Sequence, residues 1–274
     1  MKKTFLYTIF SMASLLSFLL ISFFGQERLI ILTEILYLVA PITAFLTGVF
    51  LLKNIGMKNS LGGSLFFLVL GMLSFSIGEG IWFFLDYIMG MDPYPSIADF
   101  FLLIIFPISL VGLVMKIKTE KINWTFSFFK KSLPIISILL ILTILVFYFG
   151  IFNAYMPEDG LASNLVSMLY GVGDLILIFA CFLVLIITIE YRGGKMFSPW
   201  SIVTLCYSVL LVADVLFSSN RNNYDSSLVL KTIIDCIWML GYFIFGIGML
   251  DFLDLIHEQQ KKIKDKLNLK GNER

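Results

Sequence analysis

Eight apolar segments, each long enough to cross a lipid bilayer as an α-helix, make up most of this 274-residue sequence. A helix that spans a bilayer needs about 20 consecutive, mostly apolar residues, with a usual range of about 17 to 25. Lipid offers the backbone no hydrogen-bond partners, and the segments lack the alternation of barrel strands, so helices are predicted. The predicted fold class is all-α, a polytopic integral membrane protein with eight transmembrane helices. The spans are expected at residues 5–24, 29–52, 61–90, 99–115, 133–152, 164–189, 200–218 and 228–250 or beyond.

The composition excludes an ordinary soluble domain. Hydrophobic residues make up 59% of the chain, charged residues 14%, and the mean hydropathy is +0.94. Soluble proteins average about 45–50% apolar and about 25% charged residues. The net charge is +1 and the basic residues lie in short loops, so no nucleic-acid partner is predicted. One histidine, and three cysteines inside apolar segments, give no metal-ligand spacing. We therefore predict no metal, no cofactor and no catalytic residue, and interpret the cysteines as small packing residues.

Charged residues at the segment ends predict the orientation in the cell membrane. The first apolar segment is longer than the roughly 7–15 residues of a signal peptide and ends without a small-residue cleavage site, so it is expected to be retained. Of the 20 basic residues, 17 lie on one side of the predicted spans, and only Arg28, Arg221 and Lys231 lie on the other. The positive-inside rule then predicts that both termini are cytoplasmic. An even number of spans predicts the same arrangement.

The C-terminal part is predicted to leave the membrane as a helix. We expect residues 1–256 to form the transmembrane domain and residues 257–274 a cytoplasmic helical tail. A four–three spacing of mostly apolar residues, typical of a coiled coil, runs across this boundary for fewer than three heptads. Two interpretations stay open: a solvated helix that simply ends, or a stalk that dimerises or carries a signal to a cytoplasmic partner. The spaced residues are Met249, Leu253, Ile256, Gln260, Ile263 and Leu267.

Acidic residues inside the apolar segments are the strongest functional signal. Intramembrane acids are costly, usually face the interior of a helix bundle, and mark functional sites. At about 1.5 Å per residue, Glu79 and Asp174 lie roughly 15 Å from the outer ends of their spans, and the others lie nearer. All of them fall in the outer half of a hydrocarbon core of about 30 Å. The acids are Glu79, Asp86, Asp174, Asp214 and Asp235, together with Asp99 at the start of a span.

Two of these acids stand three residues before a tryptophan, in the pairs Glu79–Trp82 and Asp235–Trp238. This spacing places the carboxylate and the indole on one helix face. Such a pair suits a small cation or an amine, by charge and by cation–π attraction. The alternative is an acid that hydrogen-bonds to the neighbouring indole or to the backbone. Because only Lys231 is near enough to neutralise the acids, we expect them to hold protons or to bind an external cation. The predicted ligand-binding residues are Glu79, Trp82, Asp99, Asp174, Asp214, Asp235 and Trp238.

The residues before the fourth span also have a structural interpretation. Ser96 followed three residues later by Asp99 has the spacing of a capping box, in which each side chain bonds the other's backbone. An acid at a helix N-terminus is also favoured by the helix dipole. Helix capping alone therefore explains Ser96 and Asp99.

The stretch from Glu79 to Pro107 carries a family resemblance. Asp92 to Leu103 reads DPYPSIADFFLL, and Pro107 follows. This stretch resembles the P-P-S-x-A-D-x-x-x-L-x-x-x-P segment of membrane modules that precede histidine kinase, PAS or GGDEF-type diguanylate cyclase domains in bacterial and archaeal signalling proteins. The likeness extends to Tyr170…Asp174, Ala213-Asp214-Val215 and Asp235…Trp238-Met239-Leu240-Gly241-Tyr242. The resemblance implies a sensory role in signal transduction and supplies no ligand. Since the sequence ends after a short helix, a stand-alone module without an output domain is expected.

Two other function classes compete with a sensor. Gly171-Val172-Gly173-Asp174 matches the G-x-G-D of intramembrane aspartyl proteases, in which two aspartates share a proton. That family places the second aspartate in the preceding span, but the fifth span has no acid, and close helix packing also explains the glycines. A transporter or ion-conducting protein would need a polar path through the inner half of the membrane. The intramembrane acids lie only in the outer half.

Overall fold

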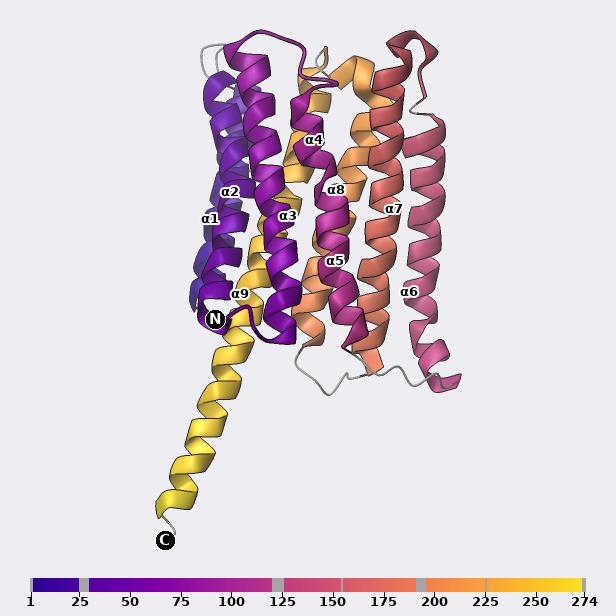
Figure 1. Ribbon diagram of the computed structural model, residues 1–274. Helices are drawn as coiled ribbons and strands as arrows, with labels where there is room; N and C mark the ends of the chain where they lie inside the picture. Colours follow the sequence, from indigo (N-terminus) through magenta and orange to yellow (C-terminus); the bar gives the residue numbers. More distant parts are fainter. Residues whose placement is uncertain are drawn as a thin grey trace.

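The computed structural model describes residues 2–24, 30–119, 126–153, 155–190, 196–224 and 226–272. Within these ranges the chain is helical and contains no strand (Figure 1). Eight helical segments are long and apolar enough to cross a membrane, which confirms the predicted fold class. The α-helices are α1 (Lys2–Phe24), α2 (Ile30–Ile55), α3 (Ser60–Phe83), α4 (Ile97–Leu103), α5 (Ile105–Lys118), α6 (Phe126–Leu145), α7 (Gly160–Glu190), α8 (Phe197–Tyr224) and α9 (Leu228–Asn272).

Several predicted span boundaries differ from the helices by a few residues, and two of the differences have a clear physical reason. The fourth span consists of α4 and α5, which meet at Ile104. Pro107 has no backbone N–H, and its ring clashes with a helical carbonyl four residues earlier, at Leu103, where α4 ends. The seventh span was expected to end at residue 218, but α8 continues to Tyr224 through a non-helical Asn220. The last residues of α8 are polar, so a hydropathy pattern does not identify them as part of the helix.

The spans alternate in direction, so the start of α1 and the extension of α9 lie at the same end of the bundle (Figure 1). This agrees with the expectation that both termini share one side of the membrane. Lys53 in the last turn of α2, and Lys116 and Lys118 in the last turn of α5, lie at this end. The opposite end, which the charge pattern predicts to face outward, carries Arg221 and Lys231. Arg28, on the loop between α1 and α2, lies outside the described residues, as do Arg192 and Lys195 between α7 and α8.

Helix α9 is the longest of the described helices. It packs against α8, α2 and α1, and its middle part is buried on all sides, as Phe245, Met249 and Phe252 are each 0% exposed. Thr4 of α1 donates a 2.7 Å hydrogen bond to Asp254 of α9. The helix then continues without a break past the bundle, visible as the yellow extension in Figure 1.

The predicted coiled-coil spacing along α9 is only partly available to a partner. Met249 and Leu253 are buried inside the bundle, and Ile256 packs against the same core. Ile263 lies beyond the bundle and is exposed, while the side chain of Leu267 lies outside the described side chains. The first part of the repeat therefore stabilises the fold itself, and a sequence pattern alone does not distinguish this packing from a dimer seam.

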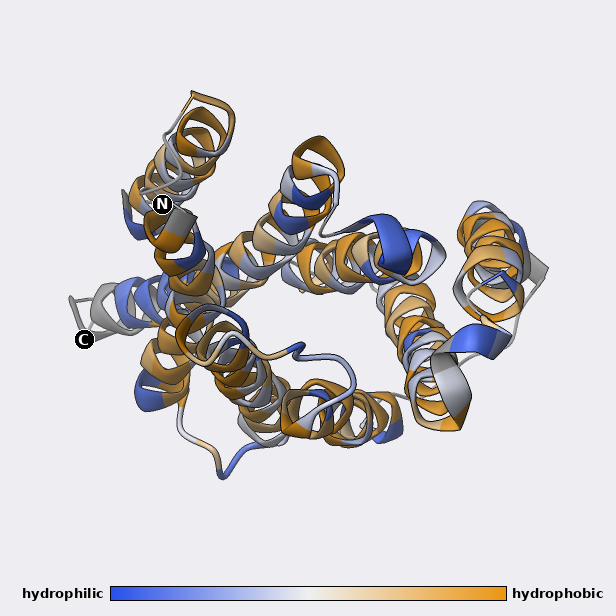
Figure 2. Cartoon of the chain, turned by 90° about the horizontal axis from the view of Figure 1, so that it is seen from above, coloured by the Kyte–Doolittle hydropathy of each residue, from blue (hydrophilic) through white to orange (hydrophobic). Residues whose placement is uncertain are grey.

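The lateral surface of the bundle is apolar. Large apolar side chains such as Leu6, Leu140 and Phe147 are more than half exposed. Seen from above in Figure 2, hydrophobic residues predominate along the helices and hydrophilic residues gather at helix ends and loops. A water-soluble monomer rarely exposes so much contiguous apolar area, whereas lipid covers it without cost. Cys181 and Cys206 are buried and Cys236 is half-buried, all as free thiols.

Candidate functional site

An acidic cavity of about 60 Å³ lies inside the predicted outer end of the bundle, bounded by α2, α3, α4, α7, α8 and α9. One water needs roughly 10–15 Å³ on such a scale, so the space suits a few waters or one small ligand. Its wall combines five carboxylic acids, one lysine and ten aromatic residues. Six of the seven predicted site residues line it. The acids are Glu34, Glu79, Asp99, Asp214 and Asp235.

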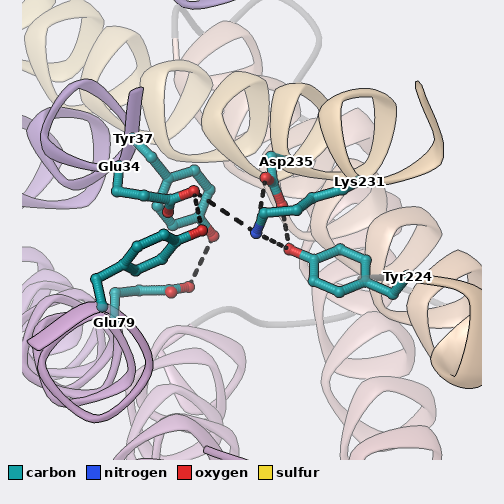
Figure 3. Close-up of polar contacts among 7 residues, drawn as sticks. Glu34, Tyr37, Glu79, Tyr224, Lys231 and Asp235 are labelled. Carbon is teal, nitrogen blue, oxygen red and sulfur yellow. Dashed lines mark hydrogen bonds and ion pairs between the residues drawn. The ribbon is translucent and has the colours of Figure 1, made fainter. Parts of the chain in front are cut away.

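Lys231 neutralises one side of the acidic cavity (Figure 3). Its Nζ lies 3.6 Å from Glu34 Oε1 on α2 and 3.5 Å from Asp235 Oδ2, one turn further along α9. The same ammonium donates to the phenol oxygen of Tyr224 at 3.2 Å and lies 4.6 Å from the centre of that ring. Tyr224 in turn donates to Asp235, and Tyr87 donates to Glu34 at 2.7 Å. This part of the cavity is therefore a closed network of charged and phenolic groups.

The opposite side of the acidic cavity holds two carboxylates that contact neutral donors. Glu79 on α3 accepts hydrogen bonds from Tyr37 on α2 at 2.9 Å and from Tyr242 on α9 at 2.6 Å. Asp214 on α8 accepts a 2.8 Å bond from the indole N–H of Trp238 on α9. Within the described part of the chain, Lys231 is the basic residue of the wall, and it pairs with Glu34 and Asp235 instead. The cavity therefore has more acidic than basic groups.

The indole contacts differ from the sequence-based alternative. That interpretation paired each acid with the tryptophan three residues later on its own helix. Instead, Trp238 bonds Asp214 across helices, and Asp235 bonds Tyr224 and Lys231. The three-residue spacing did place both Trp82 and Trp238 in the wall beside their acids.

Asp99 combines the two roles that its sequence position suggested. Its Oδ2 accepts from the backbone N–H of Ser96 at 2.7 Å, and the Ser96 hydroxyl accepts from the N–H of Ala98, which completes the predicted capping box. Its Oδ1 accepts a 2.9 Å bond from Tyr170 of α7. Although Asp99 also lines the cavity, its oxygens are taken up by the cap and by Tyr170, which makes it a structural wall residue.

Asp174 is the predicted site residue that does not line the acidic cavity. It is buried on α7, and its Oδ2 has no hydrogen-bond partner among the described residues. The glycines before it are packing residues, because a β-carbon on Gly171 would lie 2.7 Å from the side chain of Ile151, and one on Gly173 would overlap the ring of Phe106. The depth of Asp174 was predictable from sequence, but its rotation away from the cavity was not.

We expect Asp174→Asn to leave small-cation binding within about threefold of wild type, because the wall of the cavity is unchanged. The amide removes an acid that is buried without a charge partner, so the free energy of unfolding should stay equal or rise by up to about 1 kcal/mol. Thermal unfolding and calorimetric titration with tetramethylammonium measure both effects. A loss of binding comparable to that of a wall acid would show that Asp174 reaches the ligand.

Four aromatic residues separate the acidic cavity from a second, larger hollow of about 360 Å³ toward the loops. Trp82, Tyr94, Phe217 and Tyr224 line both spaces. Phe217 is the centre of this aromatic layer, since its ring contacts those of Trp82, Tyr94, Tyr224 and Trp238 at centroid distances of 5.0 to 6.2 Å. The second hollow is more polar, with Asp86, Asp92 and Arg221 in its wall. A ligand from the predicted outer side would meet this hollow first and then the aromatic layer.

Tyr94 fixes the loop between α3 and α4 against α7 and α8. Its hydroxyl donates to the carbonyl of Ser163 at 3.0 Å and lies 2.6 Å from Ser167 Oγ. Arg221 donates to that same Ser167 oxygen at 2.6 Å and lies over the Tyr94 ring at 5.1 Å. Burial raises the pKa of the Tyr94 phenol, although its contacts with Ser167 and Arg221 lower it, so the group stays neutral at physiological pH.

Glu34 is the most important wall residue that the sequence reasoning missed. It lies four residues after the start of α2, where an acid resembles an ordinary polar helix end. A usable signal was present, because Glu34 and Tyr37 repeat the acid–x–x–aromatic spacing of Glu79 and Trp82. Both side chains line the acidic cavity, and Figure 3 shows Glu34 directed toward Lys231 and Tyr37 toward Glu79. The hydroxyl donors Tyr37 and Tyr242 carried no comparable signal, since tyrosine is common near membrane interfaces.

In comparisons with known proteins, no family model, no curated protein and no solved structure matches the chain. Any functional conclusion therefore rests on the chemistry of the acidic cavity and on the helix that leads away from it.

Proposed function

We propose that this protein is a receptor-like multi-pass membrane protein that binds a small organic cation in the acidic cavity and passes the binding on through α9. The observation that carries the proposal is the wall itself, to which the described residues contribute five carboxylic acids, one lysine and ten aromatic residues. A carboxylate that is ionised away from water is costly unless a positive charge is nearby. An ammonium group supplies that charge, and aromatic rings attract it further.

The arrangement favours an ammonium ion over a metal ion. Within the described ranges, no group of three or more His, Cys, Asp or Glu side chains is placed to hold a metal. The carboxylates of Glu79 and Asp214 each accept hydrogen bonds from aromatic side chains of neighbouring helices. These bonds hold the two carboxylates apart, whereas a metal ion would need them around one point. Separate acids with intervening rings suit a larger, softer cation. The small volume limits the ligand to a few non-hydrogen atoms unless the side chains move.

Helix α9 supports the receptor role. Lys231, Asp235, Trp238 and Tyr242 of this helix line the acidic cavity, and the same helix extends without interruption beyond the opposite end of the bundle. If α9 can take two positions in the bundle, a ligand that binds one of them more tightly shifts the population of molecules toward that position. This role also agrees with the resemblance of the DPYPSIAD segment to sensor modules. The proposed orientation places the acidic cavity in the outer half of the membrane and the α9 extension in the cytoplasm.

A transporter is less well supported by the packing beyond the cavity. Along α9 the residues that follow the cavity wall are large and fully buried, including Phe245, Met249 and Phe252. Leu65 and Leu68 of α3 are also fully buried. A cation moving further would have to pass these fully buried apolar side chains, which carry no charge.

Binding is expected to stabilise the purified protein. Tetramethylammonium or methylammonium chloride should raise the unfolding temperature in a saturable way, because a ligand at 100 times its dissociation constant adds about 2.7 kcal/mol to the folded state. Sodium chloride at equal ionic strength and a neutral alcohol of similar size are the controls. If these controls give the same shift as the ammonium salts, or if no salt gives one, then the cavity is not an ammonium site.

The relay is expected to appear as a change in the position of the α9 extension. Spin labels on Ile263→Cys in the extension and Lys58→Cys at the same end of the bundle, both exposed, report their separation. Helix shifts at subunit interfaces in switching proteins are on the order of 1–2 Å, so saturating tetramethylammonium should move the distance distribution by at least that amount. The background carries Cys236→Ser, and Asp214→Asn serves as the binding-deficient control. An unchanged distribution with binding confirmed would contradict the receptor role and leave the binding site intact.

A further inference from the structure

The acidic cavity already contains an ammonium group, which belongs to Lys231. Two carboxylates, Glu34 and Asp235, lie 3.6 and 3.5 Å from its Nζ, the Tyr224 hydroxyl lies at 3.2 Å, and the Tyr224 ring centre at 4.6 Å. These are the contacts that recognise an alkylammonium ion: charge on two sides, a hydrogen-bond acceptor and an aromatic face. Three helices supply them, so the geometry is not a consequence of neighbouring positions on one helix.

We propose that Glu34, Asp235 and Tyr224 form an ammonium-binding subsite that Lys231 fills, and that the ammonium group of an external ligand takes the place of Lys231. The inference rests on the proposed function and adds to it the position of the ligand and the way in which binding is regulated. Lys231 is a tethered competitor for the site.

The position of Lys231 permits this exchange. It lies in the first turn of α9, close to the predicted outer end, and its side chain keeps 19% exposure while that of Asp235 keeps 4%. A lysine has a long flexible stem, and its charged head readily reaches water when the stem stays on an apolar surface. Exchange of one ammonium for another leaves the two carboxylates neutralised. The ligand therefore avoids the cost of unpairing buried charges, which an uncharged ligand would incur.

The exchange would also release a contact between helices. Lys231 links α9 to Glu34 on α2 and to Tyr224 on α8. Tyr87 joins this network through Glu34 from the π-helical segment Phe84–Ile88 that continues α3. A free ammonium group in the same subsite preserves the charge balance but is not covalently attached to α9. The link between α2 and α9 is then lost at the predicted outer end, while the apolar packing of α9 lower in the bundle remains. This difference between two states of α9 is what a relay requires.

Affinity for n-propylammonium in the wild type and in Lys231→Ala tests the exchange. Alanine is too short to reach the subsite, which is then empty in every molecule. A tethered competitor lowers the apparent affinity for the ligand to the extent that it occupies the subsite, so we expect the affinity for n-propylammonium to rise about tenfold or more. Lys58→Ala, an exposed lysine at the other end, should bind as wild type. In Lys231→Ala combined with Glu34→Gln, the gain should be lost. Equal affinity in wild type and Lys231→Ala overturns the exchange but not the proposed function, whereas absence of binding in both overturns the two together.

A second measurement uses the wild-type protein and does not depend on the folding of any variant. Tetramethylammonium, a quaternary ion, does not react with amine-labelling reagents, so the labelling rate of Lys231 can be followed by mass spectrometry with and without it. Displacement from the subsite should accelerate labelling of Lys231 several-fold, while labelling of Lys58 stays constant. A rate for Lys231 that stays the same or falls on addition of saturating tetramethylammonium would show that the ligand does not displace it.

Discussion

Asp214→Asn is expected to weaken binding of methylammonium, which can donate hydrogen bonds to a carboxylate, by about 10- to 100-fold. Among the wall acids, Asp214 and Glu79 accept hydrogen bonds from neutral donors, so their charge is available to a ligand. Loss of one charged contact costs about 1.5–3 kcal/mol, and each 1.4 kcal/mol is a factor of ten in affinity. Asparagine keeps the shape and still accepts from the Trp238 indole. Calorimetric titration of the purified variant measures the change, and Glu79→Gln should behave in the same way.

Asp251→Asn provides the matched control for this variant. Asp251 lies on α9 near the opposite end of the bundle, where it accepts a 2.9 Å hydrogen bond from Ser198 on an exposed surface. The chemical change is the same, but the residue is remote from the acidic cavity, so affinity should stay within about twofold because surface charges there are screened. If Asp214→Asn and Glu79→Gln both bind as tightly as Asp251→Asn, the ligand does not contact Asp214 or Glu79.

The distribution of acids along the helices was predictable because depth follows directly from residue number. Glu79, Asp214 and Asp235 were all expected in the outer half of the membrane, and they line one cavity. Asp174 was expected at about the depth of Glu79 and does not line the cavity, since a small difference in helix rotation separates a cavity residue from a buried one. A hydropathy pattern gives the length and depth of a span but not the rotation of the helix about its axis, because these helices carry apolar residues on every face.

Partners across helices were the part that the sequence did not reveal. The Trp238 indole bonds Asp214 on another helix instead of Asp235 on its own, and Tyr242 reaches Glu79 from α9 to α3. Such pairs depend on which helices are neighbours and on their relative rotation. Lys231 was recognised as the basic residue near enough to reach the acids, yet its contact with Glu34 required the packing of α2 against α9.

Gly78 shows how the packing of two helices positions the site, and its replacement is the second change with a large expected effect. A β-carbon at Gly78 would lie 2.6 Å from Leu102 Cδ2 and 3.2 Å from the Leu102 backbone nitrogen on α4. Leu102 is buried, and its backbone nitrogen can yield only if α4 itself shifts. Overpacking of this kind costs about 1–3 kcal/mol, and we expect Gly78→Ala to lose that much in free energy of unfolding.

Gly80→Ala, two residues along the same helix, should have the opposite sign. No atom lies within 4 Å of a β-carbon at Gly80, and alanine favours a helix over glycine by up to about 1 kcal/mol. The two variants should therefore differ by roughly 2–4 kcal/mol in thermal or denaturant unfolding. Because Gly78 directly precedes Glu79, moving α3 away from α4 also displaces that carboxylate from its Tyr37 and Tyr242 donors, so Gly78→Ala should lose cation affinity while Gly80→Ala keeps it. Equal stability of the two variants would mean that the approach of α3 to α4 is looser than this geometry requires, and that the position of Glu79 does not depend on it.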